Sequence, residues 1–371
     1  MGQRVLITGG AGFIGSHLAD ELLEHGHRVR ALDALAPQVH GDGRRQPSYL
    51  DKDVEVLVGD VRDRDQLDRA LRGVDGVYHF AAAVGVGQSM YEVEHYTSIN
   101  DVGTSVLMEA LIKRPVEKLV VASSMSIYGE GLYRDADGRV RAAPERSIEQ
   151  LKRGDWELRD ESGRALEPVA TPETKAPCLS SIYALSKYVQ ERMCLLIGRA
   201  YKIPTVALRF FNVYGPRQAL SNPYTGVLAI FAARYLNNKR PLIFEDGLQR
   251  RDFVSVYDIA RACRLCLETP GVEDRVFNIG SGRAYTVREI AAAMARALNK
   301  SVEPEIVGKY RMGDIRHCFA DIGLARAVLG YSPRVKLEDG VVELCEWLEG
   351  QEADDYVESA SAELATRGLT V

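Results

Sequence analysis

The opening of the chain constrains the fold most, because a glycine-rich turn there joins an apolar run to an amphipathic segment. The run RVLITGG at 4–10 has the composition of a buried strand. The segment GFIGSHLADELLEHG at 12–26 carries apolar residues at helical spacing and ends on a glycine. Between them, Gly9, Gly12 and Gly15 follow the spacing GxxGxxG. A strand, a glycine turn and a helix in this order are typical of doubly wound sheets.

The same alternation continues along the first half of the chain. Short apolar runs between amphipathic segments predict further strands at 27–33, 54–60, 76–82, 118–124 and 204–210. Strands that alternate with helices form parallel sheets covered by helices on both faces. We therefore predict an α/β protein with a Rossmann-type doubly wound parallel sheet and a smaller mixed α/β C-terminal domain.

Three parts of the chain follow from this pattern. We expect residues 1–213 to form the sheet domain and residues 214–350 to form the smaller domain, packed closely against it. Residues 351–371 are acidic and rich in Ala and Ser, so we expect a tail that is a frayed helix or disordered. A polar, turn-rich insertion at about 130–177 interrupts the sheet domain and is longer than most loops of compact domains.

Charge and composition exclude several classes of function. A formal net charge of −5 disfavours a nucleic-acid or anionic-membrane surface, and no run approaches the roughly 20 apolar residues of a membrane span. The N-terminal residues lack the apolar core of a signal peptide and the six cysteines are scattered, so we expect a cytoplasmic protein. Cys263 and Cys266 form a CxxC within a helical pattern without a second pair of ligands. We interpret them as core residues and predict no metal site.

The glycine turn has the properties of a phosphate-binding loop. Glycines let the backbone approach a pyrophosphate closely, and the following helix presents its N-terminus to it. Asp33 ends the next predicted strand, about 20 residues downstream. A carboxylate there accepts hydrogen bonds from the adenine ribose and repels a 2′-phosphate. The predicted cofactor is therefore NAD rather than NADP.

A tyrosine and a lysine add candidate catalytic groups. In SSIYALSK, Tyr183 and Lys187 are four residues apart on a predicted helix, so they share a face. Tyrosine has an ordinary pKa near 10, and a nearby lysine cation lowers the pKa by favouring the phenolate. The strand end ASSMSIYG at 122–129 supplies hydroxyls from Ser123, Ser124 and Ser126.

Together these motifs resemble those of the extended short-chain dehydrogenases/reductases, in their nucleotide-sugar epimerase/dehydratase family. The resemblance covers about residues 1–345 apart from the insertion, and rests on TGGAGFIG, HFAAA, SSMSIYG, YALSK, RFFNVYGPR, RRDFVSVYD and GDIRHCFAD. It implies that Ser124, Tyr183 and Lys187 are catalytic. It also implies a tightly held NAD, contacted by Gly9, Gly12, Phe13, Ile14, Gly15, Asp33, Asp60, Val61, Phe80, Ala81, Ala82, Asn100, Ser123, Tyr183, Lys187, Phe210 and Val213.

The resemblance further implies a nucleotide-diphosphate sugar as substrate and a homodimer as assembly. Arginine suits the substrate because its guanidinium fork matches two diphosphate oxygens. Helices near 100–113 and 183–200 are expected to pair across the dimer as a four-helix bundle. Cys318 falls where relatives place a residue that gates the sugar pocket. The implied substrate residues are Ser124, Ser126, Tyr183, Asn212, Arg217, Arg251 and Arg311.

A missing carboxylate distinguishes between the reactions of this family. The 4,6-dehydratases carry Asp-Glu directly after the catalytic hydroxyl, whereas this chain has Met125 and Ser126, which cannot act as general acid or base. Ser124 and Tyr183 can still remove a hydroxyl proton while hydride leaves the same carbon. Hydride returned to the opposite face inverts that carbon. We therefore predict a nucleotide-sugar 4-epimerase that works through a 4-keto intermediate, with a net dehydrogenase or ketoreductase and a non-catalytic NAD-binding protein as alternatives.

The sugar is indicated only by further resemblance. The stretches AAAVGVGQSMYE, SSMSIYGEGLY and RFFNVYGPRQALSNPYTGVLAIF resemble dTDP-L-rhamnose 4-epimerases, with UDP-glucose and UDP-glucuronate 4-epimerases as the alternatives. Some relatives carry CxxCG pairs resembling a zinc ribbon in the insertion, where this chain has the turns DADG and DESG without cysteine. We expect the insertion, without metal, to cover the sugar site or a subunit edge.

Overall fold

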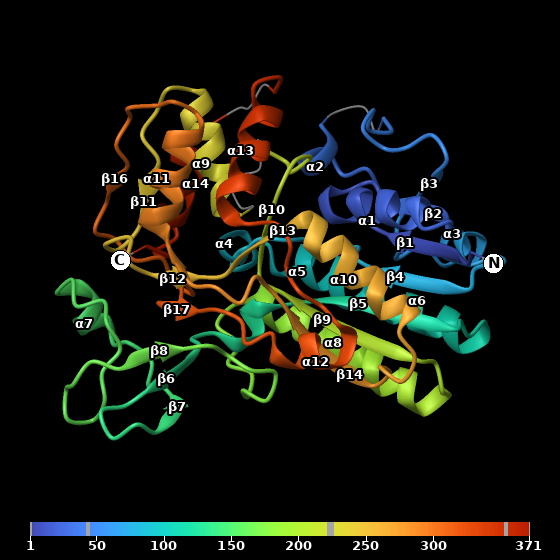
Figure 1. Cartoon of the computed structure of the whole chain (residues 1–371), viewed down its shortest axis with the longest axis horizontal. Helices are drawn as coiled ribbons and strands as arrows, with labels where there is room; N and C mark the ends of the chain where they lie inside the picture. The colour runs from blue at the N-terminus through green and yellow to red at the C-terminus, as the bar shows by residue number, and fades with distance from the viewer. Residues whose placement is uncertain (1, 42–44, 221–225, 352–354, 371) are drawn as a thin grey trace.

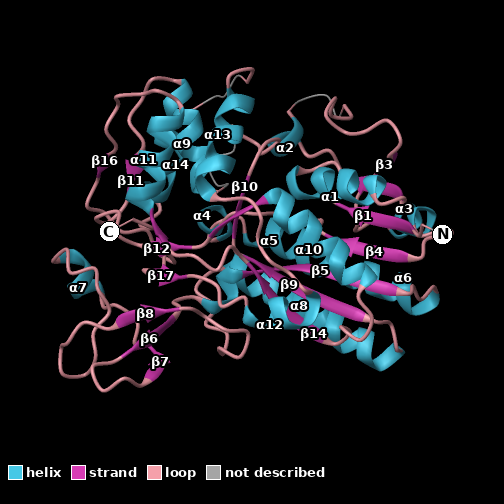
Figure 2. Ribbon diagram, viewed as in Figure 1, coloured by secondary structure: helices cyan, strands magenta, loops and turns pink. Residues whose placement is uncertain are grey.

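The protein is built around a parallel seven-stranded sheet (Figures 1 and 2). The computed structural model describes residues 2–41, 45–220, 226–351 and 355–370; SNPYT at 221–225 and part of the predicted tail lie outside these ranges. Across the sheet the order is β14 (Arg275–Ile279), β9 (Thr205–Phe210), β5 (Lys118–Ser124), β4 (Gly76–His79), β1 (Arg4–Thr8), β2 (Arg28–Asp33) and β3 (Glu55–Val58).

Helices cover both faces of the sheet, as the alternation predicts. One face carries α1 and α10, which pack against each other, and the other carries α3, α6 and α8. Each face has its own apolar core, and Cys263 and Cys266 are fully buried in the first. The bounds are α1 (Phe13–Glu24), α3 (Arg64–Ala70), α6 (Gly103–Lys113), α8 (Ile182–Tyr201) and α10 (Val256–Glu268).

Parallel pairing brings the carboxyl ends of the strands to one edge of the sheet. There the glycine turn follows β1, Asp33 ends β2, and Ser124 ends β5 opposite Phe210 of β9. On the neighbouring helix α8, the Ser181 side chain caps the N-terminus by accepting a hydrogen bond from the Ala184 amide. This cap sets the first turn of α8, which carries Tyr183.

The structure corrects the predicted boundary at residue 213. Both β14 and α10 follow this residue in the chain, yet β14 extends the sheet beside β9 and α10 packs on α1. Most of the other described residues between 226 and 350 form the smaller domain around a separate apolar core (upper left in Figure 1), whereas α12 (Gly323–Leu329) packs with α10 and β14 in the core of the sheet domain. Its main helices are α9 (Val227–Leu236), α11 (Val287–Ala297) and α13 (Leu337–Leu348).

Short strands connect the two domains and support the smaller one. β10 (Asn212–Tyr214) pairs with β13 (Phe253–Ser255), β11 (Leu242–Ile243) with β16 (Glu305–Ile306), and β12 (Arg250–Arg251) with both β15 (Tyr285–Thr286) and β17 (His317–Cys318). The short helices are α2 (Pro37–His40), α4 (Val86–Ser89), α5 (Val93–Tyr96) and α12 (Gly323–Leu329), with a π-helical stretch at Thr97–Val102 and a 3₁₀ turn at Met125–Tyr128. Among the described helices, none combines the length and hydropathy that a membrane span requires.

The insertion is ordered around a small antiparallel sheet at the lower left of Figure 1. Asp135 and Asp160 begin the two predicted turns, and each carboxylate accepts backbone amide hydrogen bonds within its own turn. These Asx-type contacts hold the turns in the absence of cysteine. Its elements are β6 (Leu132–Arg134), β7 (Val140–Ala142), β8 (Glu167–Val169) and α7 (Ile148–Lys152).

The described part of the tail contradicts the expectation of a frayed or disordered end. It forms α14 (Val357–Thr366), and Val357, Ala360 and Leu364 are buried on one face of this helix. Their three- and four-residue spacing is that of an amphipathic helix with a narrow apolar stripe. The sequence signal was weak because the segment is otherwise polar and small.

Candidate active site

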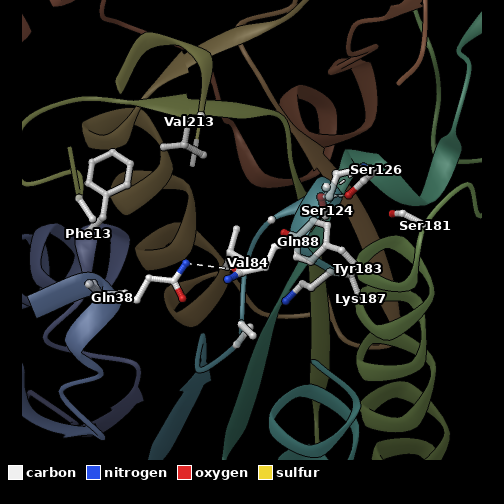
Figure 3. Close-up of a pocket in the computed structure, with 18 of the residues that line it drawn as sticks. Phe13, Gln38, Val84, Gln88, Ser124, Ser126, Ser181, Tyr183, Lys187 and Val213 are labelled. Carbon is white, nitrogen blue, oxygen red and sulfur yellow. Dashed lines mark hydrogen bonds between the residues drawn. The ribbon is translucent and has the colours of Figure 1, made fainter. Parts of the chain in front are cut away.

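A cavity of about 890 Å³ runs along the carboxyl edge of the sheet and continues between the two domains. Figure 3 shows Phe13 and Gln38 on one side of the cavity and Ser124, Ser126, Tyr183 and Lys187 grouped on the other. Most of the predicted site residues line it: Gly9, Gly12, Phe13, Ile14, Gly15, Asp33, Asp60, Val61, Phe80, Ala81, Ala82, Ser123, Ser124, Ser126, Tyr183, Lys187, Phe210, Asn212, Val213, Arg251 and Arg311.

The glycine turn is shaped for close approach of a ligand. Gly9 has φ of +74°, a conformation that favours glycine, and a Cβ on Gly15 would lie 2.3 Å from the Gly9 carbonyl oxygen. Gly12 caps α1 without any side-chain hydrogen bond to the helix. The first amide groups of α1 are therefore not covered by a capping side chain, and they suit a pyrophosphate.

Two carboxylates, Asp33 at the end of β2 and Asp60 just after β3, lie on the same side of the cavity. Asp33 accepts hydrogen bonds from the amides of Ala11 (3.0 Å) and Leu35 (2.9 Å), which fix its orientation beside the glycine turn. A hydrogen bond from Arg62 lowers the pKa of Asp60, so this carboxylate is ionised at neutral pH. The turn and Asp33 together fit an adenine dinucleotide.

Ser124 and Tyr183 meet at the centre of the cavity. The Tyr183 hydroxyl is hydrogen-bonded to Ser124, and the Ser124 and Ser126 hydroxyl oxygens are 2.5 Å apart. Ser123 points the other way, as alternation along a strand requires, and donates to Glu191 at 2.7 Å. One strand end and one helix therefore bring three hydroxyls together.

The expectation of a lowered tyrosine pKa is not met in this structure. Burial raises the pKa of Tyr183, and the hydrogen bond to Ser124 offsets only part of that effect. Desolvation disfavours the phenolate because that form is charged. Tyr183 is accordingly a neutral phenol here, and its use as a base requires additional positive charge near the hydroxyl.

Lys187 is held by a polar chain that the sequence reasoning missed. Its ammonium donates to Gln190 Oε1 at 2.7 Å, and Gln190 Nε2 donates to Thr104 Oγ1 at 2.9 Å and lies 3.3 Å from His79 Nε2. Burial lowers the pKa of Lys187 to about 8 and that of His79 to about 3. The available signal was the spacing: Gln190 follows Lys187 by three residues on one helix face.

Carboxylates are scarce along the cavity wall. Among the described lining residues only Asp33, Asp60 and Asp314 carry one. The first two belong to the side of the glycine turn, and Asp314 accepts a hydrogen bond from Arg311 at 2.8 Å. The positions after Ser124 are held by Met125 and Ser126, so the described wall offers no carboxyl acid or base beside the Ser124–Tyr183 pair.

The wall of the smaller domain supplies arginines and an amide. The Arg251 guanidinium donates to the carbonyls of Arg316 (2.8 Å) and Ile315, which hold it at the cavity. Arg311 lies over the Phe244 ring, 4.5 Å from its centroid. Asn212 also faces the cavity. This end can bind a diphosphate through charge-assisted hydrogen bonds.

The structure places two predicted site residues outside the cavity wall. Asn100 is fully buried. Its side-chain oxygen accepts from the Ala83 amide and its side-chain nitrogen donates to the Ala83 carbonyl, and Ala83 itself lines the cavity. Arg217 forms an ion pair with Asp20 at 2.7 Å and stacks over Tyr49. Motif matching located both segments but not the direction of these side chains.

The insertion and Cys318 also lie away from the cavity. No residue between 127 and 179 belongs to its described wall, so the expected cover over the sugar site is not seen. Cys318 is buried, and its sulfur contacts the Thr171 hydroxyl at 3.9 Å. The insertion is instead fastened to the smaller domain through Glu157, which binds Arg316 and His317.

Comparison with known proteins agrees with this geometry. The profile of the NAD dependent epimerase/dehydratase family matches residues 5–148 and 162–280. A dTDP-L-rhamnose 4-epimerase of Burkholderia thailandensis is 36% identical over 357 residues, which is 95% of this chain and 96% of that protein. A putative UDP-glucose 4-epimerase of Methanocaldococcus jannaschii is 32% identical, over 93% of this chain and 98% of its own length.

Solved structures show the same fold with ligands in place. A UDP-glucose 4-epimerase of Thermus thermophilus, in complex with NAD, is 33% identical with a TM-score of 0.74, and the match covers 94% of this chain and all of that one (100%). A UDP-glucuronic acid 4-epimerase of Bacillus cereus, in complex with UDP-glucuronic acid and NAD, is 28% identical with a TM-score of 0.76, over 93% and 99% of the two chains.

Proposed function

The chain belongs to the NAD-dependent epimerase/dehydratase family, and from this premise we propose that it is a nucleotide-sugar 4-epimerase. The observation that carries the proposal is the pairing of Ser124 with Tyr183. Among the described residues of the cavity wall, none next to this pair carries a carboxyl group that could act as acid or base. These groups can support the removal and return of a hydroxyl proton and a hydride at one carbon. They supply nothing for expelling water from the neighbouring carbons.

NAD is the cofactor, and the residues at the glycine turn fit it. The amide groups at the N-terminus of α1 would hold its pyrophosphate, and Asp33 would accept hydrogen bonds from the adenine ribose hydroxyls and repel a 2′-phosphate. Bound NAD would supply a hydride acceptor and donor for C4 of the sugar and, in its oxidised form, positive charge near Tyr183. It is regenerated in each turnover, so we expect the protein to retain it tightly.

The chain's own residues move the proton. Tyr183 takes the proton of the sugar 4-hydroxyl, and Ser124 hydrogen-bonds the same oxygen and can relay that proton. Lys187, buried and protonated below its pKa of about 8, is proposed to favour the phenolate together with the positive charge of the oxidised cofactor. The 4-keto sugar then turns about its link to the pyrophosphate, and Tyr183 returns the proton after hydride arrives at the opposite face.

The diphosphate anchors the substrate while the sugar turns. Arg251, Arg311 and Asn212 face the same cavity and are proposed to hold the nucleotide end. Arg217 is not part of this anchor, since it lies outside the cavity wall and its guanidinium is engaged by Asp20. With the nucleotide end fixed, only the sugar has to reorient between the two hydride transfers.

We propose dTDP-L-rhamnose as the sugar nucleotide, with UDP-glucose and UDP-glucuronate as the alternatives to be tested beside it. The 36% identity to a dTDP-L-rhamnose 4-epimerase over most of both chains supports this order. Each nucleotide sugar is incubated with the purified protein, and NMR monitors inversion at C4. Inversion without free NADH at 340 nm supports the proposal, whereas net NADH release identifies a dehydrogenase.

We further propose a cytoplasmic homodimer. Val102, Leu185 and Leu196 are 43–55% exposed at the π-helical stretch and on α8, where the four-helix bundle is expected. Large apolar side chains exposed together on packed helices favour a second subunit as their cover. The cysteines are free thiols, as is usual for cytoplasmic proteins.

A further inference from the structure

We propose that the C-terminal segment 355–370 forms the wall of the nucleotide end of the substrate site and binds the nucleobase; this inference rests on the proposed function. Five residues of the segment line the same cavity as the catalytic groups: Val357, Ala360, Ser361, Leu364 and Leu369. Four of them are apolar and one carries a hydroxyl. The face of α14 that packs inward is therefore also a surface of the site.

The N-terminal end of this segment is fixed to the smaller domain by buried charges. Asp355 and Arg234 are both about 95% buried or more and lie 3.1 Å apart. Lys239 reaches the same carboxylate at 3.0 Å, and Glu358 accepts from Arg234 at 2.9 Å. Breaking a buried ion pair leaves an uncompensated charge, so this contact holds the start of α14 against α9.

The C-terminal end is tied to the segment that carries Arg311. The Met312 amide donates to the Leu369 carbonyl at 2.9 Å, and Arg311 and Thr370 form an antiparallel bridge. The Arg367 guanidinium lies over the Tyr91 ring at 4.4 Å, on the side of the sheet domain. The segment thus spans from the smaller domain to the sheet domain across the cavity.

The smaller domain adds apolar and aromatic side chains to the same cavity. Val227, Ile230 and Phe231 of α9 and Phe244 line the same cavity as the tail. A planar base gains from contact with aromatic and aliphatic surfaces on its two faces. In a nucleotide sugar, only the ribose separates the base from the diphosphate. A ligand whose diphosphate binds Arg311 therefore places its base near the C-terminal segment, which is bonded to the chain at Arg311 and Met312.

Two matched substitutions on α14 test this inference. Ala360 is buried at the cavity, and Ala362 is exposed and outside it. In the protein with bound NAD, Ala360→Trp is expected to weaken binding of dTDP and UDP, and to raise KM for the nucleotide sugar, by about tenfold or more, whereas Ala362→Trp changes neither. Removal of residues 351–371 should weaken nucleotide binding similarly, and retained NAD shows that the truncated protein still folds.

Calorimetric titration with dTDP and UDP separates the outcomes. Equal nucleotide affinity in the wild type, Ala360→Trp and the truncated chain contradicts the inference and leaves the proposed function intact. Tighter binding after truncation also contradicts it, because the tail would then obstruct the site. A wild type that binds neither nucleotide contradicts the proposed function, and the inference falls with it.

Discussion

The ammonium of Lys187 lies 2.7 Å from Gln190 Oε1, and the amide nitrogen of the same glutamine donates to Thr104. Lys187 is almost completely buried, so the glutamine provides a polar partner that water does not. A buried cation without such a partner loses its proton more readily. Gln190 is therefore a positioning residue for Lys187. Lys187 in turn follows Tyr183 by four residues on the same helix.

Replacing Gln190 should shift the pH dependence of catalysis. Burial already lowers the pKa of Lys187 to about 8, and Gln190→Met removes a hydrogen bond that favours the cation, so the pKa falls further. Activity requires the protonated lysine, and it should decline with rising pH at a lower pH than in the wild type. The measurement is kcat across pH 6–10, with KM expected to change little. An unshifted alkaline limb would show that Gln190 has only a structural role.

Removing the tyrosine hydroxyl should abolish most of the turnover. Tyr183→Phe deletes the group that exchanges the 4-hydroxyl proton, and a loss of about 10²–10⁴-fold in kcat is expected for one positioned acid-base residue. NAD content and dTDP binding should stay close to wild type, since Tyr183 is one of many residues along the cavity. Retention of more than a tenth of wild-type kcat would assign the proton transfer to another group.

The contact of Glu157 with Arg316 and His317, which fastens the insertion to the smaller domain, should depend on pH. Hydrogen bonds from His317 and Arg316 lower the pKa of Glu157 to about 2. Because the folded-state pKa lies below the ordinary value, the carboxylate stabilises the fold above about pH 4.5, and this contribution is lost as pH falls toward 2. Glu157→Gln should lower Tm at pH 7 by about 2 °C, with a clearly smaller difference at pH 3.

The matched control for Glu157→Gln is Glu145→Gln, at an exposed position of the same insertion. Its Tm should follow the wild type at both pH values. A Glu157→Gln difference that stays constant between pH 7 and pH 3 would contradict the role of the ionised carboxylate.

A charge on the exposed face of α8 should separate the proposed dimer. Leu196 is 55% exposed, and Leu196→Glu would bury a carboxylate against a second subunit. Light scattering should then report half the wild-type mass. The control is Val342→Glu on α13, 46% exposed and away from this face, which should leave the mass unchanged. A wild type that is already monomeric contradicts the dimer.

The sequence patterns predicted those features of the fold that depend on residues close together in the chain. The parallel strands and the glycine turn follow from apolar runs and spacing, and the sheet topology then brings Ser124 and Tyr183 together. β14 was missed because RVFNI is a five-residue run that joins the sheet only through tertiary pairing with β9. Arg217 was misplaced because its direction depends on Asp20, 197 positions away in the chain.

The position of the tail and the polar chain behind Lys187 could not be predicted from the sequence, because both depend on contacts between distant parts of the chain. α14 buries three small or medium apolar side chains, too few for a strong periodic signal. Its place over the cavity depends on ion pairs to Arg234, which no local pattern reveals. The raised pKa of Tyr183 likewise reflects burial by the whole fold, whereas the sequence showed only the neighbouring lysine.

Isotope incorporation tests the central claim most directly. The nucleotide sugar that reacts fastest is converted in D₂O, and the product is analysed by mass spectrometry and NMR. Direct hydride return through a 4-keto sugar predicts a product of unchanged mass, inverted at C4 and free of carbon-bound deuterium. Loss of water or CO₂, or deuterium at C3 or C5, would contradict a 4-epimerase built on Ser124 and Tyr183.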